Sequence, residues 1–342
     1  MKKNRLFAAA LGLMMAASVL SGCGSSAGSN AGGSGSGSGA AKEASLPKSI
    51  EVLVPAKAGG GTDVMARALS QEIAAKSGSN ITIVNNTDGG GVVACETVRT
   101  AKPDGAKLLQ FHTTMLIKTA TGVYDKSAAE DFKVIAVSEP VEKVTYILLT
   151  NTSSGLDTMD KFVEYAKANE VKMGIETGGQ AHILSGLMAK TAGLNLKYVE
   201  SGSATEQLTA LVGNTVDAVF VNANQAKQYL EAGKVYALAA VGNGDKEAHS
   251  AVLPDVPNMQ ELGYDISWTL FNMILGPKDM DDALAKKIWE FYAEAAKSDE
   301  VNSVLTPAGM DMVFLPYEDG QAKLQAMQEM LNPIVEELGL KK

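Results

Sequence analysis

Short runs of β-branched and apolar residues alternate with helical patterns along most of this chain, and no other feature constrains its fold as strongly. Helices between strands are typical of the α/β class, in which crossover helices join largely parallel strands. Apolar residues at helical spacing, such as Val64, Leu69 and Ile73, predict the helices. We expect strands over residues 50–55, 81–85, 107–112, 134–138, 144–150, 171–176, 197–199, 216–221, 235–241 and 269–275.

The first residues are typical of a secretory signal. Lys2, Lys3 and Arg5 precede an apolar run over 6–20, which is too short to span a bilayer comfortably. Small residues then precede Cys23, as in the lipobox of bacterial lipoproteins, where the cysteine thiol is acylated and the residue becomes the new N-terminus. The chain is therefore predicted to be anchored to a membrane through lipid on Cys23.

These signals divide the N-terminal region into two expected segments. A lipoprotein signal peptide is predicted over 1–22. Residues 24–41 are almost wholly Gly, Ser and Ala, a composition with too little apolar surface to offset the entropy of ordering the chain. Residues 23–47 are therefore expected to form a lipid-anchored, Gly/Ser-rich flexible tether.

The charge of the expected mature chain limits its partners. Removing 22 of the 342 residues leaves 320, which is enough for two domains. Because the signal holds three of the 30 basic residues and no acidic one, 27 basic residues remain against 39 acidic ones, a net charge of −12. An acidic chain argues against nucleic acid as a partner and gives no long-range attraction to an anion. Any bound anion must therefore be held by local donors.

The cysteines and histidines do not indicate an enzyme. If Cys23 is lipidated, Cys95 has no disulfide partner in the chain, and we expect it to be a small buried residue on a helix. His112, His182 and His249 are the three histidines, and none stands at metal-ligand spacing from another. No G-x-S-x-G elbow follows a strand, so a hydrolase has no support. We expect neither a metal nor another cofactor.

The most informative segment is a predicted strand that runs through a glycine-rich turn into a helix. The turn contains Gly59, Gly60 and Gly61, and Thr62 adds a hydroxyl group. Main-chain N–H groups at such a turn converge with the positive end of the helix dipole, so they can bind an anion without a basic side chain. The alternative is that these glycines only permit a tight turn.

Two nucleotide motifs can be tested against this turn. A Rossmann pattern that starts at Gly59 requires glycine at position 64, where the chain has Val64. The phosphate loop requires Gly-Lys followed by Ser or Thr, and this sequence does not occur. A carboxylate is therefore a better candidate than a nucleotide for the anion.

Five motifs occur in order along the chain. They are Pro-x-x-x-Gly-Gly-x-x-Asp-x-x-x-Arg at Pro55, Gly59, Gly60, Asp63 and Arg67, a glycine-rich segment at 86–91, Pro-Asp-Gly at 103–105, Ala-Leu-x-Gly-x-x-Val-Asp at 210–217, and Pro-x-Val-Pro-x-x-x-Glu-x-Gly-Tyr at 254–264. With these motifs the chain resembles the substrate-binding proteins of the tripartite tricarboxylate transporter family, also called Bug receptors. The likeness extends from about residue 50 to the C-terminus.

The resemblance implies a two-domain fold of the periplasmic-binding-protein type II, or Venus flytrap, kind with two crossover strands. These strands correspond to 144–150 and 269–275. Domain 1 is then expected to comprise 48–145 and 271–342, and domain 2 to comprise 146–270.

The resemblance also implies that two loops, one from each domain, hold a ligand carboxylate. The first loop corresponds to 59–63. The second departs from the family pattern Gly-Ser-x-x-His, because a glutamine takes the polar position and the histidine comes one residue early. Glu200 stands in a second stretch that departs from the pattern, and if it faces the cleft it would favour a ligand with an amine or a bound cation. The second loop comprises Thr177, Gly178, Gly179, Gln180, Ala181 and His182.

Several side chains have a binding and a structural interpretation. Asp63 can contact the ligand or a bridging water, or it can stabilise the helix dipole, whereas Arg67 is expected to pair with Asp63. His182 is a candidate donor to a carboxylate, although a lone histidine more often packs or caps. Thr113 and Thr114 follow a strand and are expected to reach the cleft, or else to form a simple turn. Ser203 begins a capping box and is a second candidate donor.

The expected function is therefore transport reception outside the cytoplasm. The protein would be a monomer at the extracytoplasmic face of the bacterial cell membrane. It would capture a small carboxylate, with a di- or tricarboxylate expected, and would deliver it to the integral membrane permease. A lipoprotein that presents its ligand to a membrane sensor, and an enzyme on the same fold, remain as alternatives.

Overall fold

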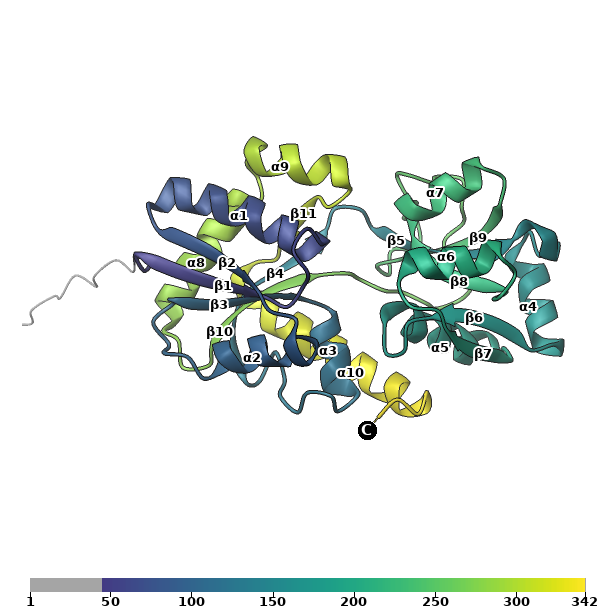
Figure 1. Cartoon of the computed structure of the whole chain (residues 1–342), viewed down its shortest axis with the longest axis horizontal. Helices are drawn as coiled ribbons and strands as arrows, with labels where there is room; N and C mark the ends of the chain where they lie inside the picture. Colours follow the sequence, from purple (N-terminus) through teal and green to yellow (C-terminus); the bar gives the residue numbers. More distant parts are fainter. Residues whose placement is uncertain (1–44, 342) are drawn as a thin grey trace, which may run out of the picture. The chain divides into compact units, whose positions relative to one another are not determined.

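The computed structural model describes residues 45–341, and Ala44–Lys342 forms one compact unit. The predicted signal peptide, Cys23 and most of the predicted tether lie outside the described residues. The described chain forms two β-sheets with helices packed against them (Figure 1). It therefore has the predicted α/β fold.

The first sheet has six strands in the order β11-β4-β10-β3-β1-β2. Its helices come from both ends of the described chain. The strands are β1 (Ser49–Val54), β2 (Asn80–Asn85), β3 (Lys107–His112), β4 (Phe132–Pro140), β10 (Asn272–Pro277) and β11 (Met312–Phe314). The helices are α1 (Gly61–Ser77), α2 (Val92–Arg99), α3 (Thr114–Ala120), α8 (Asp282–Ala295), α9 (Asp299–Leu305) and α10 (Gly320–Glu337). Short 3-10 turns lie at η1 (Asp88–Gly91), η3 (Thr306–Ala308) and η4 (Tyr317–Asp319).

The second sheet has five strands in the order β7-β6-β8-β5-β9, all from the middle of the chain. The strands are β5 (Val144–Asn151), β6 (Val171–Ile175), β7 (Leu196–Glu200), β8 (Ala218–Asn222) and β9 (Val235–Gly242), and the helices are α4 (Met159–Ala168), α5 (Gln180–Ala192), α6 (Ala204–Val212) and α7 (Ala223–Glu231), with a 3-10 turn at η2 (Thr152–Ser154).

The strand directions correct one prediction. We predicted largely parallel sheets, but only four of the nine strand pairs in the described chain are parallel. Every antiparallel pair contains β5, β10 or β11. β5 and β10 are the first strands after the chain passes from one sheet to the other, so no crossover helix constrains them to run parallel to a neighbour.

The chain passes between the sheets twice. The first passage, over 141–143, joins β4 to β5, and the second, over 243–271, joins β9 to β10. The two predicted crossover strands correspond to β5 and β10, and each lies within one sheet immediately after a passage. The domain boundaries proposed from the sequence remain a prediction.

Apolar clusters on the faces of the sheets hold the helices in place. Val52, Leu69 and Ile288 belong to a buried cluster that joins the first sheet to α1, α8 and α9. A second cluster, which contains Leu208 and Val221, joins the second sheet to α6 and α7. Cys95 lies on α2 and is 2% exposed, as predicted, and burial raises the pKa of its thiol to about 12.

The helices differ in how their N-termini are capped. α4, α7, α8 and α9 begin after a polar side chain that accepts a hydrogen bond from a main-chain N–H of the first turn, namely Thr158, Asn222, Asp281 and Ser298. By contrast, α1 begins after Gly60 and α5 after Gly179, and neither has a side-chain cap. The first N–H groups of any helix lack a partner within the helix, and in these two helices no capping side chain accepts from them either.

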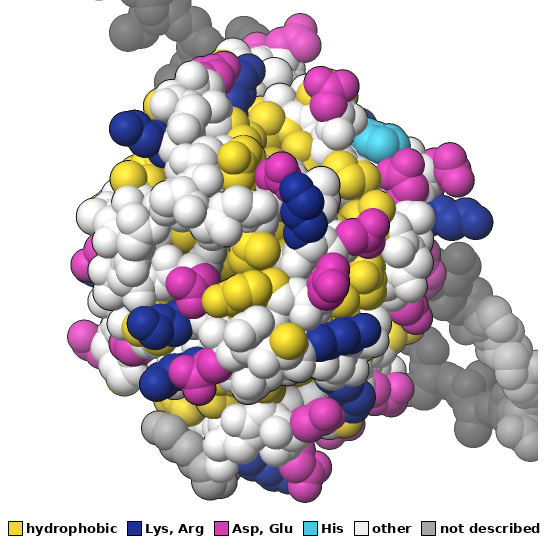
Figure 2. All heavy atoms as spheres, turned by 90° about the vertical axis from the view of Figure 1, so that its right-hand side faces the viewer, with side chains coloured by type: hydrophobic (Ala, Val, Ile, Leu, Met, Phe, Trp, Pro, Cys, Tyr) yellow, Lys and Arg dark blue, Asp and Glu magenta, His cyan; other side chains and the backbone are white. Residues whose placement is uncertain are grey.

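The surface has no single dominant charge on the face shown in Figure 2. Acidic and basic side chains are interspersed there, with apolar side chains between them. Within residues 45–341, no helix is both long enough and apolar enough to cross a bilayer.

Candidate functional site

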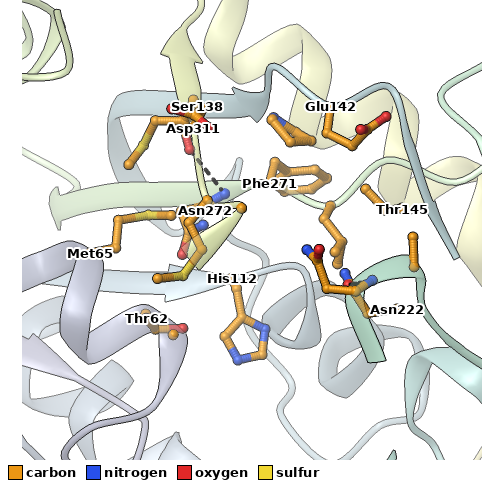
Figure 3. A pocket seen from close by; sticks show the side chains of 18 of the residues that line it. Thr62, Met65, His112, Ser138, Glu142, Thr145, Asn222, Phe271, Asn272 and Asp311 are labelled. Atoms are coloured by element: carbon orange, nitrogen blue, oxygen red, sulfur yellow. Dashed lines mark hydrogen bonds between the residues drawn. The ribbon is translucent and has the colours of Figure 1, made fainter. Parts of the chain in front are cut away.

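Two adjoining cavities are lined by residues of both sheets. The first, of about 240 Å³, is lined by the start of α1, the end of β8 and the 309–312 segment before and within β11. The second, of about 390 Å³, is lined by α3 and by the turn that leads into α5. His112, the last residue of β3, lines both. In the close view of the first cavity, His112 lies between Thr62 of α1 and Asn222 of β8 (Figure 3).

The first glycine loop, Gly59–Asp63, is held in shape by Asp63. The Asp63 carboxylate accepts hydrogen bonds from the Gly59 N–H at 2.8 Å and from Asn85 Nδ2 at 2.9 Å. Arg67 pairs with it at 2.9 Å, as predicted. Gly59 has φ +80°, a conformation that favours glycine. Asp63 is 2% exposed and lines neither cavity, so in this structure its carboxylate organises the loop.

These contacts stabilise the ionised form of Asp63. The Arg67 side chain has the largest effect, with further contributions from the Gly59 N–H and from Asn85, and together they lower the pKa of Asp63 to about 2 against the opposing effect of burial. The loop therefore keeps its internal charge across the physiological pH range. Its outer part, Gly61 and Thr62, lines the first cavity.

The second glycine loop, Thr177–His182, is held by His182. The Gly178 N–H donates to His182 Nδ1 at 3.3 Å, and Gly178 has φ +74°. The ring packs on Tyr198, with centroids 4.5 Å apart, and is 4% exposed. Because Nδ1 accepts, the ring proton is on Nε2, which has no partner among the described residues. Burial lowers the pKa of His182, and nearby Glu200 opposes this.

Glu200 also supports the second loop. Its carboxylate accepts hydrogen bonds from the N–H and hydroxyl of Thr177 and from the Gly202 N–H. These bonds, that of the Thr177 hydroxyl first, lower the pKa of Glu200. Glu200 is not among the residues that line the two cavities, so this structure gives no support to the idea that it attracts an amine or a cation.

Gln180, which departs from the family pattern, contacts a residue of the second sheet. Its Oε1 accepts a hydrogen bond from the hydroxyl of Tyr146 on β5, and both side chains line the second cavity. Burial raises the pKa of Tyr146 well above its ordinary value, so the phenol stays protonated and keeps donating. Gln180 therefore fixes the start of α5 relative to β5.

The predicted site residues thus divide into two groups. Thr113, with a hydroxyl bonded to the main chain of Phe271, and Ser203, with a hydroxyl that donates to Glu206, line neither cavity. Gly59, Gly60, Asp63 and His182 shape the loops behind the cavity walls. The predicted site residues that line a cavity are Gly61, Thr62, Thr177, Gly178, Gly179 and Gln180, and Thr114 and the loop residue Ala181 line the second cavity too.

The sequence analysis missed His112 as a site residue. The Thr114 N–H donates to His112 Nδ1 at 3.3 Å, so the ring proton lies on Nε2. Burial, and to a smaller extent the positive charge of Lys118, lower the pKa of His112 to about 4. At neutral pH it is an uncharged hydrogen-bond donor between the two cavities. Its position at the end of a strand, one residue before Thr113, was the signal that could have identified it.

Lys118 was also missed. It lies on α3 among the apolar residues Met115, Leu116 and Ile117, so the pattern there indicates only a buried helix. The structure places it in the lining of the second cavity, near the start of α5.

The first cavity has a different character. Its wall is formed mainly by apolar side chains, among them Met65, Phe271 and Met310, and it contains the acidic residues Glu142 and Asp311 but no lysine or arginine (Figure 3). Among residues 45–341, no group of three or more His, Cys, Asp or Glu side chains is arranged to hold a metal ion.

Comparison with known proteins identifies the family. Residues 65–340 match the model of the tripartite tricarboxylate transporter family receptor. The protein BugT of Bordetella pertussis is 25% identical over 271 residues, which are 78% of this chain and 82% of BugT.

Solved structures have the same fold. A TctC solute-binding protein from Polaromonas superposes with a TM-score of 0.73 at 21% identity, covering 84% of this chain and 97% of that one. MatC from Rhodopseudomonas palustris, with bound malate, superposes with a TM-score of 0.65 at 21% identity over 84% and 98% of the two chains. An R. palustris protein with adipate reaches 0.66 at 19% identity over 85% and 97%. The chain therefore belongs to the tripartite tricarboxylate transporter receptor family.

Proposed function

We propose that this protein captures a small organic carboxylate in the two adjoining cavities and delivers it to a tripartite tricarboxylate-type permease. One observation carries the proposal. The uncapped starts of α1 and α5 both open into these cavities, so main-chain N–H groups are available to an anion from two sides.

The chemistry of the cavities supports a carboxylate. Thr62 adds a hydroxyl, His112 a neutral N–H and Lys118 a positive charge, and each lines one or both cavities. The acidic net charge of the chain makes such local donors necessary. Relatives of the same fold are described with malate and with adipate, which are both carboxylates.

Delivery requires that the loaded receptor differ from the empty one. In the proposed mechanism, domain 1 (48–145 and 271–342) and domain 2 (146–270) close on the ligand by bending at the two passages, and the permease binds the closed form. Lipid on Cys23 would keep the receptor at the extracytoplasmic face of the membrane, with 23–47 as the tether.

A thermal-shift screen of the purified protein against mono-, di- and tricarboxylates, amino acids, sugars and nucleotides tests the proposal. A ligand that binds only the native state raises the melting temperature, and we expect selective rises with carboxylates. A rise only with sugars or nucleotides would refute a carboxylate receptor. Pull-down of the permease by the loaded protein, but not by the empty one, would distinguish delivery to a permease from presentation to a sensor.

A further inference from the structure

Lys118 differs from every other lysine in residues 45–341. The residue is partly buried, and its ammonium group forms no hydrogen bond or ion pair with any described residue. The other described lysines that are partly buried, which are Lys107, Lys126, Lys133, Lys287 and Lys323, all pair with a carboxylate. The remaining lysines of this part of the chain are exposed to solvent. A partly buried ammonium group without a counter-ion is costly, which indicates that an anion binds beside it.

A glycine lies beside this ammonium group. A Cβ atom placed on Gly90 would lie 2.8 Å from Lys118 Nζ, so a larger residue there would displace the side chain. Gly90 has φ +67° and belongs to η1, which lies against α2. The glycine therefore provides space for the ammonium group next to the second cavity.

Other groups of the second cavity are unsatisfied too. The first N–H groups of α5 face it without a side-chain cap, and α5 has 13 residues. Gln207 is 4% exposed, lines the same cavity, and has no partner for Oε1 among the described residues; this oxygen only accepts, so it would pair with a donor rather than with the carboxylate. Glu176 is the single carboxylate in the lining of this cavity, and it is exposed and forms no ion pair with Lys118.

The first cavity is unfavourable for a second carboxylate. The N-terminus of α1 contributes a partial positive charge of about half a unit. Glu142 and Asp311 place two carboxylates in the same lining, and no lysine or arginine compensates for them. Three asparagines, Asn222, Asn224 and Asn272, are uncharged and can hydrogen-bond a polar group, whereas Met65, Phe271 and Met310 suit a hydrocarbon or aromatic group.

We propose that Lys118 is the residue that determines specificity. It pairs with one ligand carboxylate at the start of α5, and the rest of the ligand, which is apolar and has no second carboxylate, extends past His112 into the first cavity. The ligand class is then a monocarboxylate with an apolar body. This inference rests on the proposed function, because it assumes that a carboxylate is bound.

Matched pairs of acids test the charge requirement. Calorimetric titration of the full chain with hexanoate and adipate, butyrate and succinate, and benzoate and terephthalate compares ligands that differ by one carboxylate. We expect the monocarboxylate of the best-binding pair to bind at least about 10-fold more tightly, because a second carboxylate would be desolvated beside Glu142 and Asp311. Hexanamide and benzamide, which lack the charge, should not bind measurably.

Variants of Lys118 test the contact. Lys118→Met keeps the length of the stem and removes the charge, so affinity for the best monocarboxylate should fall by about 10- to 100-fold. Lys118→Arg should retain most of the affinity, and Lys102→Met, at an exposed lysine outside both cavities, should leave it unchanged. A melting temperature within a few degrees of the parent shows that each variant is folded.

The outcomes separate this inference from the proposed function. If the dicarboxylates bind more tightly, or if Lys118→Met leaves affinity unchanged, the inference is wrong and the carboxylate receptor stands. If no acid binds while an uncharged ligand does, both are wrong. Preference for the monocarboxylate together with its loss in Lys118→Met supports the inference.

Discussion

The two glycine loops share one task in the proposed function, but they are held by different chemistry. In the first, the buried carboxylate of Asp63 pairs with Arg67 and accepts from the Gly59 N–H. In the second, the uncharged ring of His182 accepts from the Gly178 N–H. A fixed charge therefore organises one loop and a titratable neutral base organises the other. Two similar glycine turns can therefore be built on supports that respond differently to mutation and to pH.

The largest expected effect is on stability. Asp63→Ala should lower the free energy of unfolding by about 2–3 kcal/mol, because it removes a buried charged acceptor of several hydrogen bonds. Glu200→Ala in the second loop should cost less, because that side chain is exposed. Urea denaturation measures both. Equal losses would mean that the supports of the two loops do not differ in strength.

Closing either helix N-terminus with a side chain should weaken ligand binding. Gly60→Asp and Gly179→Asp place a cap at positions with φ −73° and −83°, which other residues adopt, although the new Cβ would lie 3.1 and 3.0 Å from a carbonyl oxygen. The cap would occupy the N–H groups. At α5 it would also repel the ligand carboxylate, so Gly179→Asp should lower affinity by about 10- to 100-fold, whereas Gly60→Asp, beside the apolar part of the ligand, should lower it less.

Thr158→Asp on α4, which exchanges one cap for another away from both cavities, is the control for these variants. It should leave affinity unchanged. If only one of the two glycine variants loses affinity, only that loop contacts the ligand, and the other is a structural turn.

The pH response should distinguish the loops. The pKa of His182 is lowered from 6.5, so its contribution to stability is complete above pH 6.5 and is lost as the pH falls through that value towards the folded pKa. Protonation also removes the Nδ1 acceptor of the Gly178 N–H. The pKa of Asp63 is lowered from 3.8 to about 2, so its contribution of about 2 kcal/mol is lost only as the pH falls from 3.8 towards 2.

Amide resonances measured by NMR from pH 7.5 to 3 check this. The Gly178 amide should shift below pH 6.5, as His182 is protonated, whereas the Gly59 amide should stay constant until below pH 4. His182→Asn should abolish the Gly178 transition, and the exposed His249→Asn should not. His112 titrates over part of the same range, with a pKa of about 4, so global stability alone would not separate the two histidines.

The smallest expected effect concerns a capped helix. Thr158→Ala removes the side chain that accepts the Lys161 N–H at the start of α4, and should cost about 1 kcal/mol without any change in affinity. Thermal unfolding and ligand titration of this variant check both expectations. A loss of affinity would show that capping affects binding indirectly, through the stability of the whole unit.

Local patterns were sufficient to predict most of the fold. The β-branched runs identified the strands from β1 to β10 to within a few residues, because each is bounded by turn residues or by a change of period. β11 was missed because three residues are too few for a period, and it forms only by pairing with β4. Strand direction was mispredicted because it depends on partners that are distant in sequence.

The sequence was sufficient to predict the candidate site only where main-chain groups form it. The glycines that begin α1 and α5 can be recognised from their neighbours in the sequence. Lys118 could not, because its significance lies in the absence of a counter-ion, and that depends on which residues fold around it. In the same way, only the structure shows that the Ser203 hydroxyl is bonded to Glu206.

The glycine caps also bear on how such receptors diverge. A main-chain N–H is the same whatever side chain its residue carries, so the groups that would face an anion at α1 and α5 in the proposed function are largely insensitive to mutation as long as the turns are kept. Apolar residues on the cavity walls, such as Met65 and Phe271, can then be exchanged one at a time, and under the proposed function the capacity to hold a carboxylate would persist. A lineage built in this way can acquire new ligands in small steps, without passing through a receptor that binds nothing.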